Sequence, residues 1–281
     1  MLSALAGVDA CAEDLGESPD YEIVDAGPGR PDLVDAAEPS VDATPLDAGD
    51  GCPSGRGPEL IRAGATCVDR TEVTYAQYQQ FIDDTAGDAG GQVPECIWND
   101  YLPYSGWPYP VGMQHHPVRD VTWCSAHAYC LWAGKRLCGT PGTGASVAPK
   151  DVADASADEW FAACSRGGER VYPYGDSFQP DACNVGEAGT VPPAYREGSV
   201  PVATMQDCEG GYAGIMDMSG NAEEWENACE ATTAGDAGRM DVCLVRGGGF
   251  GTPTDKLACD GRGRLFRGNH AGIRCCATPE F

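Results

Sequence analysis

Two stretches of the chain space their apolar residues as amphipathic helices do. Between Glu72 and Ile82, polar and apolar residues first alternate and then repeat at the spacing of one helix face. The second stretch, residues 125–133, starts at Ser125, a favourable helix cap, and its apolar residues share one face. We therefore predict two main helices. Their inward-facing residues are Tyr78, Phe81 and Ile82 in the first, and Ala126, Tyr129, Cys130 and Ala133 in the second.

The remaining pattern predicts a fold with little regular structure. Residues 156–163 continue the helical spacing, after a Gly- and Ala-rich insertion at 139–155 that we interpret as a surface loop. Elsewhere, glycines, prolines and aromatic residues separate short apolar runs, which is typical of irregular loops around small sheets. Arg246-Gly-Gly-Gly-Phe250 is such a run, a strand that enters a turn. The chain is therefore expected to be loop-rich.

One run, Asp217-Met-Ser-Gly-Asn-Ala-Glu-Glu-Trp225, places oxygen-bearing groups at alternating positions around a glycine. Asp217 and Glu224 offer carboxylates, and the carbonyls of Gly220 and Ala222 can turn toward the same point. Hard oxygen ligands of this kind suit Ca²⁺. The same residues also fit a solvated acidic turn that caps a helix starting near Asn221. On residue types alone, the two interpretations are equal alternatives.

An aromatic run extends from Trp98-Asn-Asp-Tyr101 to Trp107-Pro-Tyr109. Aromatic side chains in a loop more often pack against the domain than line a ligand groove, and both arrangements are open here.

The first 50 residues differ in composition from the rest. They carry 13 Asp or Glu against the single Arg30, among prolines and glycines. Such a segment cannot bury enough apolar surface to offset its chain entropy. We predict that residues 1–50 form a disordered acidic linker and residues 51–281 one folded domain; a short strand at 21–24 is the alternative.

Charge narrows the choice of partners. The formal net charge of −25, about half of it from residues 1–50, argues against nucleic acid or an anionic membrane as a partner. No segment is long and apolar enough to predict a transmembrane helix. A protein or a glycan is the expected ligand.

Fifteen cysteines are spread through the chain, without the paired spacing of zinc knuckles. They predict disulfides and therefore an extracytoplasmic protein, whether secreted, periplasmic or surface-anchored. Pairs that close short loops are expected first. These are Cys52 with Cys67, Cys124 with Cys138, Cys229 with Cys243, and Cys183 with Cys208.

Several sequence motifs lie in order along residues 52–281. The downstream ones are Tyr212-Ala-Gly-Ile-Met216 with the Asp217 run, Val245-Arg-Gly-Gly-Gly-Phe250 and Gly272-Ile-Arg-Cys275; upstream are Cys67-Val-Asp-Arg-Thr-Glu-Val-Thr74, His116-Pro-Val118, residues 128–137 and Tyr172-Pro-Tyr-Gly175. Together they resemble the formylglycine-generating enzyme, or sulfatase-modifying factor, family. The resemblance implies an α+β fold like that of C-type lectins, with two helices on a twisted antiparallel sheet.

The resemblance also implies two disulfides, Cys130 with Cys275 and Cys164 with Cys259. Cys11, Cys96 and Cys276 remain, and the last two could pair with each other. Cys11 follows a short apolar stretch and is a candidate lipid anchor; a free or intermolecular thiol, or a simple secreted start, is the alternative.

The chemistry of the family is incomplete in this sequence. The family's oxidases carry two cysteines, five residues apart, that bind copper just after the Gly-Gly-Phe turn. Here residues 250–258 contain no cysteine. Gly249 replaces the family's serine and Glu223 its tryptophan. We therefore expect no copper site. We expect no iron centre either, because in related enzymes its histidines come from an additional helical domain.

The Asp217 run matches the family pattern more closely than the segment after Phe250 does. Asp217, Gly220, Ala222 and Glu224 match the ligand positions of the family's second calcium site. For its first calcium site, Asn184 and the carbonyl of Val185 match, but residues 194–199 lack the expected aspartate. The sequence thus predicts calcium as the cofactor.

These observations lead to a functional hypothesis. The chain is expected to be a calcium-stabilised binding or structural module, a pseudoenzyme of the family. The alternatives are a family oxidase or non-haem-iron C–S bond-forming enzyme that works with another subunit, and a lectin-like carbohydrate binder.

Overall fold

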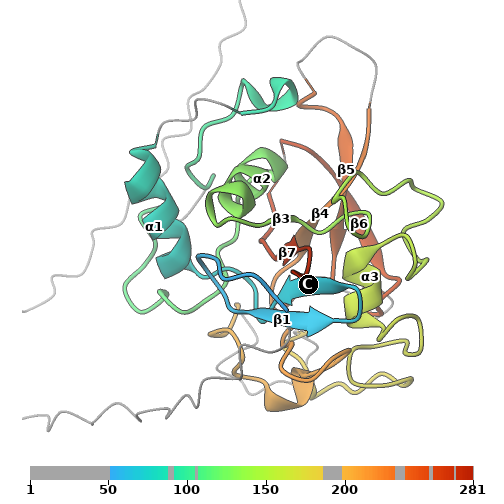
Figure 1. Ribbon diagram of the computed structural model, residues 1–281. Coiled ribbons are helices and arrows are strands. Elements are labelled where there is room, and N and C mark those ends of the chain that lie inside the picture. The colour runs from blue at the N-terminus through green and yellow to red at the C-terminus, as the bar shows by residue number, and fades with distance from the viewer. Residues whose placement is uncertain are drawn as a thin grey trace, which may run out of the picture. The chain divides into compact units, whose positions relative to one another are not determined.

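The computed structural model describes residues 51–87, 92–104, 107–185, 198–231, 238–252, 256–268 and 270–280. The predicted linker of residues 1–50, with Cys11 in it, lies outside this range. Within it, the domain has the predicted loop-rich α+β fold, with small antiparallel sheets, few helices and many disulfides (Figure 1). None of the helices in the described residues is long and apolar enough to cross a bilayer.

Two small sheets organise the domain. One has the strand order β1-β2-β7-β3 and the other β4-β5-β6, and all of their strand pairs are antiparallel. The bounds of the first sheet's strands are β1 Leu60–Ala63, β2 Thr66–Asp69, β3 Arg136–Leu137 and β7 Cys275–Ala277. Those of the second are β4 Glu224–Glu230, β5 Val242–Arg246 and β6 Arg262–Phe266.

The helices lie close to their predicted positions but begin at different residues. They are α1 Tyr75–Thr85, α2 Trp123–Trp132 and α3 Glu159–Cys164, with short 3₁₀ turns η1 Pro94–Cys96 and η3 Gln206–Cys208. The cap of α2 is Thr122 and not Ser125, whose N–H donates to the Thr122 hydroxyl. Thr74 caps α1 in a capping box with Gln77.

The four-stranded sheet has a core on each face. Tyr78, Phe81 and Tyr129 from α1 and α2 pack together with Cys275 on one side. Trp160 of α3 packs with Cys276 on the other. Neighbouring residues of a strand point to opposite faces, so β7 joins the two cores.

The predicted surface loop at 139–155 is partly buried. Val147 and Val152 pack against Ala228 of β4 and Leu244 of β5. The insertion therefore packs against the second sheet through these two strands.

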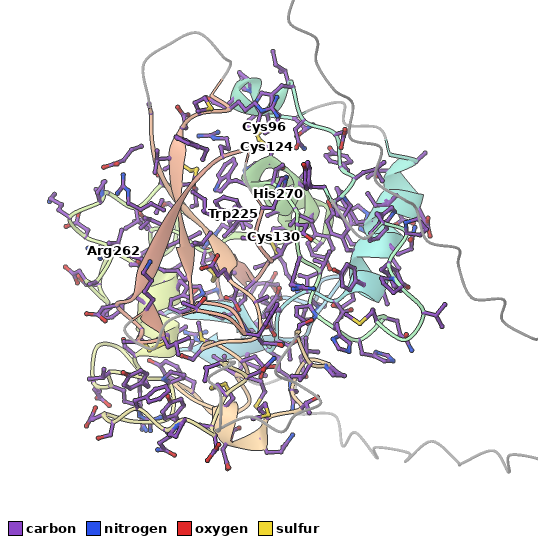
Figure 2. The ribbon with its side chains drawn as sticks, turned by 180° about the vertical axis from the view of Figure 1, so that it is seen from behind. Cys96, Cys124, Cys130, Trp225, Arg262 and His270 are labelled. Atoms are coloured by element: carbon purple, nitrogen blue, oxygen red, sulfur yellow. A yellow bond between two sulfur atoms is a disulfide. The ribbon has the colours of Figure 1, made fainter. Side chains whose placement is uncertain are left out.

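Seven disulfides join all the described cysteines. Five were expected: Cys52–Cys67, Cys130–Cys275, Cys164–Cys259, Cys183–Cys208 and Cys229–Cys243. The expected Cys124–Cys138 pair is wrong, as is the suggestion that Cys96 pairs with Cys276. Cys124 is bonded to Cys96 of η1 (Figure 2), and Cys138 to Cys276.

The position of Cys138 explains this correction. It follows β3, which pairs with β7 so that Arg136 lies opposite Cys276. Cys138 thus lies beside Cys276, on the α3 side of the sheet, whereas Cys124 belongs to the core on the α2 side. Loop length along the sequence carries no information on which face of a sheet a side chain occupies.

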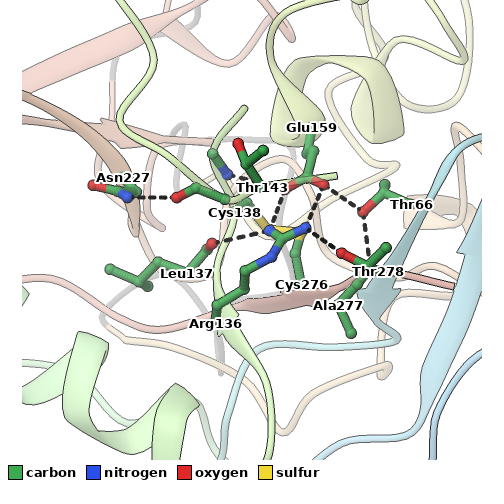
Figure 3. A network of polar contacts seen from close by, with 12 residues as sticks. Thr66, Arg136, Leu137, Cys138, Thr143, Glu159, Asn227, Cys276, Ala277 and Thr278 are labelled. Carbon is green, nitrogen blue, oxygen red and sulfur yellow. Dashed lines mark hydrogen bonds and ion pairs between the residues drawn. A yellow bond between two sulfur atoms is a disulfide. The ribbon is translucent and has the colours of Figure 1, made fainter. Parts of the chain in front are cut away.

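A polar network beside the Cys138–Cys276 disulfide fixes α3 against the sheet (Figure 3). Arg136 forms an ion pair with the buried Glu159 at 2.5 Å, and the Thr66 hydroxyl donates to Glu159 at 2.9 Å. Arg136 also donates to the Thr278 hydroxyl. This network connects β2, β3, α3 and the end of β7.

Candidate functional site

A pocket of about 250 Å³ lies beside the turn that follows β5. Four separate segments line it, and the turn contributes Phe250. The lining residues are Arg119, Asp120, Asn221, Ala222, Glu223, Gly249, Phe250, Gly251, Thr252, His270, Ala271 and Gly272. We call this the Phe250 pocket.

Backbone pairing brings these segments together. The Gly272 N–H donates to the Glu223 carbonyl at 2.6 Å, and the Phe250 N–H donates to the Asn221 carbonyl at 3.3 Å. Ala271 and Val121 form an antiparallel bridge. The turn itself requires glycine at Gly248, which has φ +67° and whose Cβ would come within 2.8 Å of Thr252.

The pocket carries charged groups of both signs on a partly apolar wall. The Arg119 guanidinium lies 5.0 Å from the centre of the Phe250 ring, and its Nε atom is buried without a hydrogen-bond partner. Burial raises the pKa of Glu223, and Lys256 opposes that rise. Burial lowers the pKa of His270, which Asp120 opposes and Arg239 reinforces. The arrangement suits recognition of a polar ligand.

No thiol lines the Phe250 pocket, and each cysteine in the described part of the chain belongs to a disulfide. Cys259, which follows the turn, is bonded to Cys164 of α3. Gly249 and Glu223, the two departures from the family pattern, both line the pocket.

The Asp217 run leads into a strand and not into a helix, so the helix-cap interpretation is wrong. Asp217 has φ +63° and is buried, and its Oδ2 accepts a hydrogen bond from the Ala203 N–H at 2.6 Å. Glu224 is the first residue of β4, and both of its carboxylate oxygens accept hydrogen bonds from Arg274. Trp160 Nε1 also donates to Glu224 at 2.7 Å.

A third carboxyl group, that of Glu72, shares this environment. It is fully buried and lies close enough to Asp217 for the two carboxyl groups to interact. Burial and the neighbouring Asp217 charge raise the pKa of Glu72 well above its usual range. Burial raises the pKa of Asp217 to about 6, Glu224 adds to the rise, and Arg274 opposes it. Three buried carboxyl groups therefore share one guanidinium.

The structure also brings the two predicted calcium sites against each other. The Asn221 N–H donates to the Asn184 carbonyl at 2.8 Å, and the Asn184 side chain donates to Asn221 Oδ1 at 3.1 Å. A Cβ at Gly220 would lie 2.5 Å from the Asn184 carbonyl oxygen and 3.0 Å from the Val185 side chain. The Asn184 Oδ1 atom is buried without a partner. Ala222, in contrast, lies in the wall of the Phe250 pocket.

These oxygen donors meet some, but not all, of the requirements of a hard cation such as Ca²⁺. The surplus of buried carboxylates and the unpartnered Asn184 Oδ1 favour a cation. Glu224, however, is already neutralised by Arg274. Among the residues described, no three Asp, Glu, His or Cys side chains form a ready metal cluster. Asp217 is thus the predicted ligand with the most negative charge left to neutralise.

Glu72 and Arg274 were missed as members of this site. Both lie in motifs that carried the family resemblance, and the signal was a charged residue between apolar neighbours: Glu72 before Val73, and Arg274 after Ile273. A charge at a buried position of such a pattern implies a partner.

The aromatic run divides into two parts. Tyr109 stacks on Tyr75 of α1 at 5.3 Å, and Trp107 contacts Tyr78, so this half packs on the core. Trp98 and Tyr104, in contrast, line a second hollow that shares His270 with the Phe250 pocket.

Comparison with known proteins places this geometry in context. Residues 56–279 match the family model for the sulfatase-modifying factor enzyme 1-like domain. The formylglycine-generating enzyme of Bos taurus is 29% identical, over 59% of this chain and 49% of its own length. The inactive C-alpha-formylglycine-generating enzyme 2 of Mus musculus is 30% identical, over 60% of this chain and 51% of its own.

Two further proteins are similar to this chain. The hercynine oxygenase of Mycolicibacterium thermoresistibile is 25% identical over 70% of this chain and 47% of its own length. The crystal structure of CarF superposes with a TM-score of 0.50 at 21% identity, over 81% of this chain and 97% of that one, which supports the fold alone. The chain spans about half the length of these curated relatives.

Proposed function

The chain belongs to the sulfatase-modifying factor enzyme 1-like domain family, and within that family we propose that it is an extracytoplasmic, calcium-stabilised binding module without copper-dependent formylglycine-generating activity. The observation that carries this proposal is the Phe250 pocket, whose wall contains Gly249, Phe250 and Glu223 but no thiol. A copper(I) site needs soft thiolate ligands, and the cysteines on either side of the turn, Cys243 and Cys259, are both held in disulfides.

The pocket is suited to binding. Its floor is made by backbone of glycine-rich segments, so a ligand can approach closely, while Arg119, Glu223 and His270 supply polar contacts. One of the relatives is itself named an inactive enzyme, which is consistent with a family member that keeps the domain without the reaction.

Disulfide content supports the extracytoplasmic location. Seven disulfides persist only where thiols are oxidised, as they are in secreted, periplasmic and surface-exposed proteins. The proposal includes a surface-anchored protein, in which Cys11 would carry the lipid anchor.

Calcium would be held by Asp217 and the Gly220 carbonyl, with Asn184 and Val185 next to Gly220. Bound there, calcium would neutralise the surplus carboxylate charge around Asp217. Glu224, the other predicted carboxylate ligand, is paired with Arg274 and would bind calcium only if that ion pair opened.

An activity assay tests the central claim. A synthetic sulfatase peptide that contains the target cysteine is incubated with the full chain and copper, and formylglycine is measured by mass spectrometry. We expect no turnover, with the Bos taurus relative as the positive control. Turnover above the copper-only background would refute the proposal.

Metal analysis addresses the calcium claim and a second candidate function. The similarity to hercynine oxygenase favours, as that second candidate, an oxidase or iron-dependent enzyme that works with another subunit. Calcium without copper or iron in the purified protein supports the binding module, and stoichiometric copper or iron supports catalysis. Chelation should lower the melting temperature of the wild type and leave that of Asp217→Ala unchanged. A wild-type melt that is indifferent to calcium would exclude a stabilising calcium site.

A further inference from the structure

The second hollow has a volume of about 420 Å³ and opens beside the Phe250 pocket. Its walls include Trp98, Asp100, Tyr104, Arg239 and His270, and we call it the aromatic hollow. His270 (labelled in Figure 2) lines both depressions. The proposed binding function and the calcium site make no use of the other four residues.

One wall is an exposed aromatic ring held in a fixed orientation. Tyr104 is 79% exposed, yet its ring stacks on His270 with centroids 4.5 Å apart and an interplanar angle of 22°. The Tyr104 N–H donates to the Asp120 carbonyl at 2.8 Å, which fixes its backbone. One face of the ring is therefore covered by His270, and the rest is open to solvent.

Trp98 also lines the hollow, with the Arg239 guanidinium over its ring. The guanidinium carbon lies 5.1 Å from the ring centre, and the indole N–H donates to the Glu95 carbonyl at 2.8 Å. The Arg239 carbonyl accepts a hydrogen bond from the Gly268 N–H at 3.1 Å. Both side chains are thus oriented before any ligand arrives.

Polar groups of both kinds border the hollow. Asp100 and Arg239 are exposed, so a carboxylate acceptor and a guanidinium donor face the same space. Deeper in, the Thr122 hydroxyl donates to Asn99 Oδ1 at 2.6 Å, and these two groups satisfy each other. Hydrogen bonds to a ligand would therefore come from Asp100 and Arg239.

This combination discriminates between ligand classes. A cation would stack well on Tyr104 but would be repelled by Arg239. An anion would pair with Arg239 but would be repelled by Asp100, in a chain of net charge −25. A purely apolar ligand would leave both charged groups desolvated and unpaired. A neutral molecule with an apolar face and several hydroxyl groups meets all of these conditions.

We propose that the aromatic hollow binds a neutral sugar ring of a glycan. The C–H face of the ring would stack on Tyr104, and neighbouring hydroxyls would donate to Asp100 and accept from Arg239. This inference rests on the proposed binding function but not on calcium, because none of these residues belongs to the Asp217 cluster.

The test is a glycan array probed with the full chain in calcium and again in chelator. The best glycans are then measured by titration calorimetry against variants. We expect binding that survives chelation and weakens about tenfold in Tyr104→Ala, with Tyr104→Phe close to wild type because the ring is kept. Asp100→Asn should weaken binding about tenfold by removing a charged acceptor.

The matched control is Phe266→Ala, which removes an exposed aromatic ring of β6 that does not line the hollow. Its affinity should equal that of the wild type, and unchanged melting temperatures would show that the variants are folded. An array without any glycan hit would overturn the proposal. So would a glycan whose affinity is lost on chelation but unaffected by Tyr104→Ala, because such a sugar would bind at the calcium site. Neither result bears on the peptide-oxidation assay, which tests the proposed function separately.

Discussion

Buried charges in this domain are balanced at one basic residue and in acidic excess at two others. Lys135 pairs with Asp69 at 2.5 Å, whereas Arg246 pairs with two acids, Asp158 and Glu226. The excess is largest around Arg274, where three acids gather: Glu224 in direct contact, and Glu72 and Asp217 within range of its charge. Such an excess is tolerated only if a proton or a cation neutralises it. The Asp217 position is therefore a point where stability depends on solution conditions.

The raised pKa of Asp217 gives a prediction with a definite sign. Its folded value of about 6 exceeds the ordinary 3.8, so between these pH values the folded chain holds the proton more tightly than the unfolded chain. In chelator, the free energy of unfolding should thus fall as the pH rises from 4 to 6. A shift of about two units corresponds to about 3 kcal/mol. Urea unfolding at several pH values measures it.

Two variants isolate this contribution from the other carboxyl groups. Asp217→Asn cannot ionise and should show a flatter pH profile than the wild type. Asp84→Asn, an exposed position on α1, should leave the profile unchanged. Added calcium should stabilise the wild type most at the higher pH, where Asp217 is ionised. Parallel profiles for the wild type and Asp217→Asn would show that Asp217 does not carry the shift.

At the scale of elements, helices were more predictable than strands. α1 and α2 followed from apolar spacing, because each buries one face in the aromatic core. β4 gave no such signal, since Glu224 and Glu226 are charged but fully buried. Their partners, Arg274 and Arg246, lie 50 and 20 residues further along the chain. A strand stabilised by distant arginines cannot be recognised from its own residues.

The candidate site was predictable to a similar extent. The acidic run pointed to the segment that holds the buried Asp217 and Glu224, and the resemblance pointed to the turn at Phe250, because both signals depend on residues adjacent in sequence. The packing of Asn184 on Gly220, and of Tyr104 on His270, joins segments far apart in the chain. Contacts of that kind follow from the tertiary fold alone.

Arg246 connects three elements, and its removal provides an element-level prediction. Its guanidinium bonds to Asp158, the cap of α3, to Glu226 of β4 at 2.6 Å, and to the Val152 carbonyl. Arg246→Ala would leave two buried carboxylates uncompensated and should lower the free energy of unfolding by about 3–5 kcal/mol. The exposed Arg264 of β6, paired with Glu230 of β4, is the control. Arg264→Ala should cost less than about 1 kcal/mol. If urea unfolding showed equal losses of stability for Arg246→Ala and Arg264→Ala, burial would not be what determines the contribution of these ion pairs.

At the scale of the whole domain, disulfides tie the C-terminal strand to the middle of the chain. Cys130–Cys275 and Cys138–Cys276 span 145 and 138 residues, and Cys164–Cys259 spans 95. The first two leave β7 from neighbouring residues on opposite faces and anchor both cores to the same strand. Their contributions to stability are therefore expected to depend on each other.

The chain-entropy model makes this dependence quantitative. With one of the two bonds intact, the other closes an effective loop of only about 10 residues, which contributes about 3 kcal/mol. When the first bond has already been removed and Cys164–Cys259 is kept, the remaining bond closes an effective loop of about 45 residues. Its removal then costs about 4 kcal/mol. Each single pair of Cys→Ala changes should thus cost about 3 kcal/mol, and the combined variant about 7.

Urea unfolding of the three variants under oxidising conditions measures the excess, which is the cost of the combined variant minus the summed costs of the two single ones. The reference is a variant with Cys52→Ala and Cys67→Ala. The Cys52–Cys67 bond closes its own loop of 15 residues, independent of the other disulfides. The cost of its loss should therefore add to that of either single variant. An excess near zero for the β7 pair would mean that these bonds act through local packing in their separate cores. An excess of about 1 kcal/mol would show that they act as one constraint on the unfolded chain, with the second bond securing the register of β7 between α2 and α3.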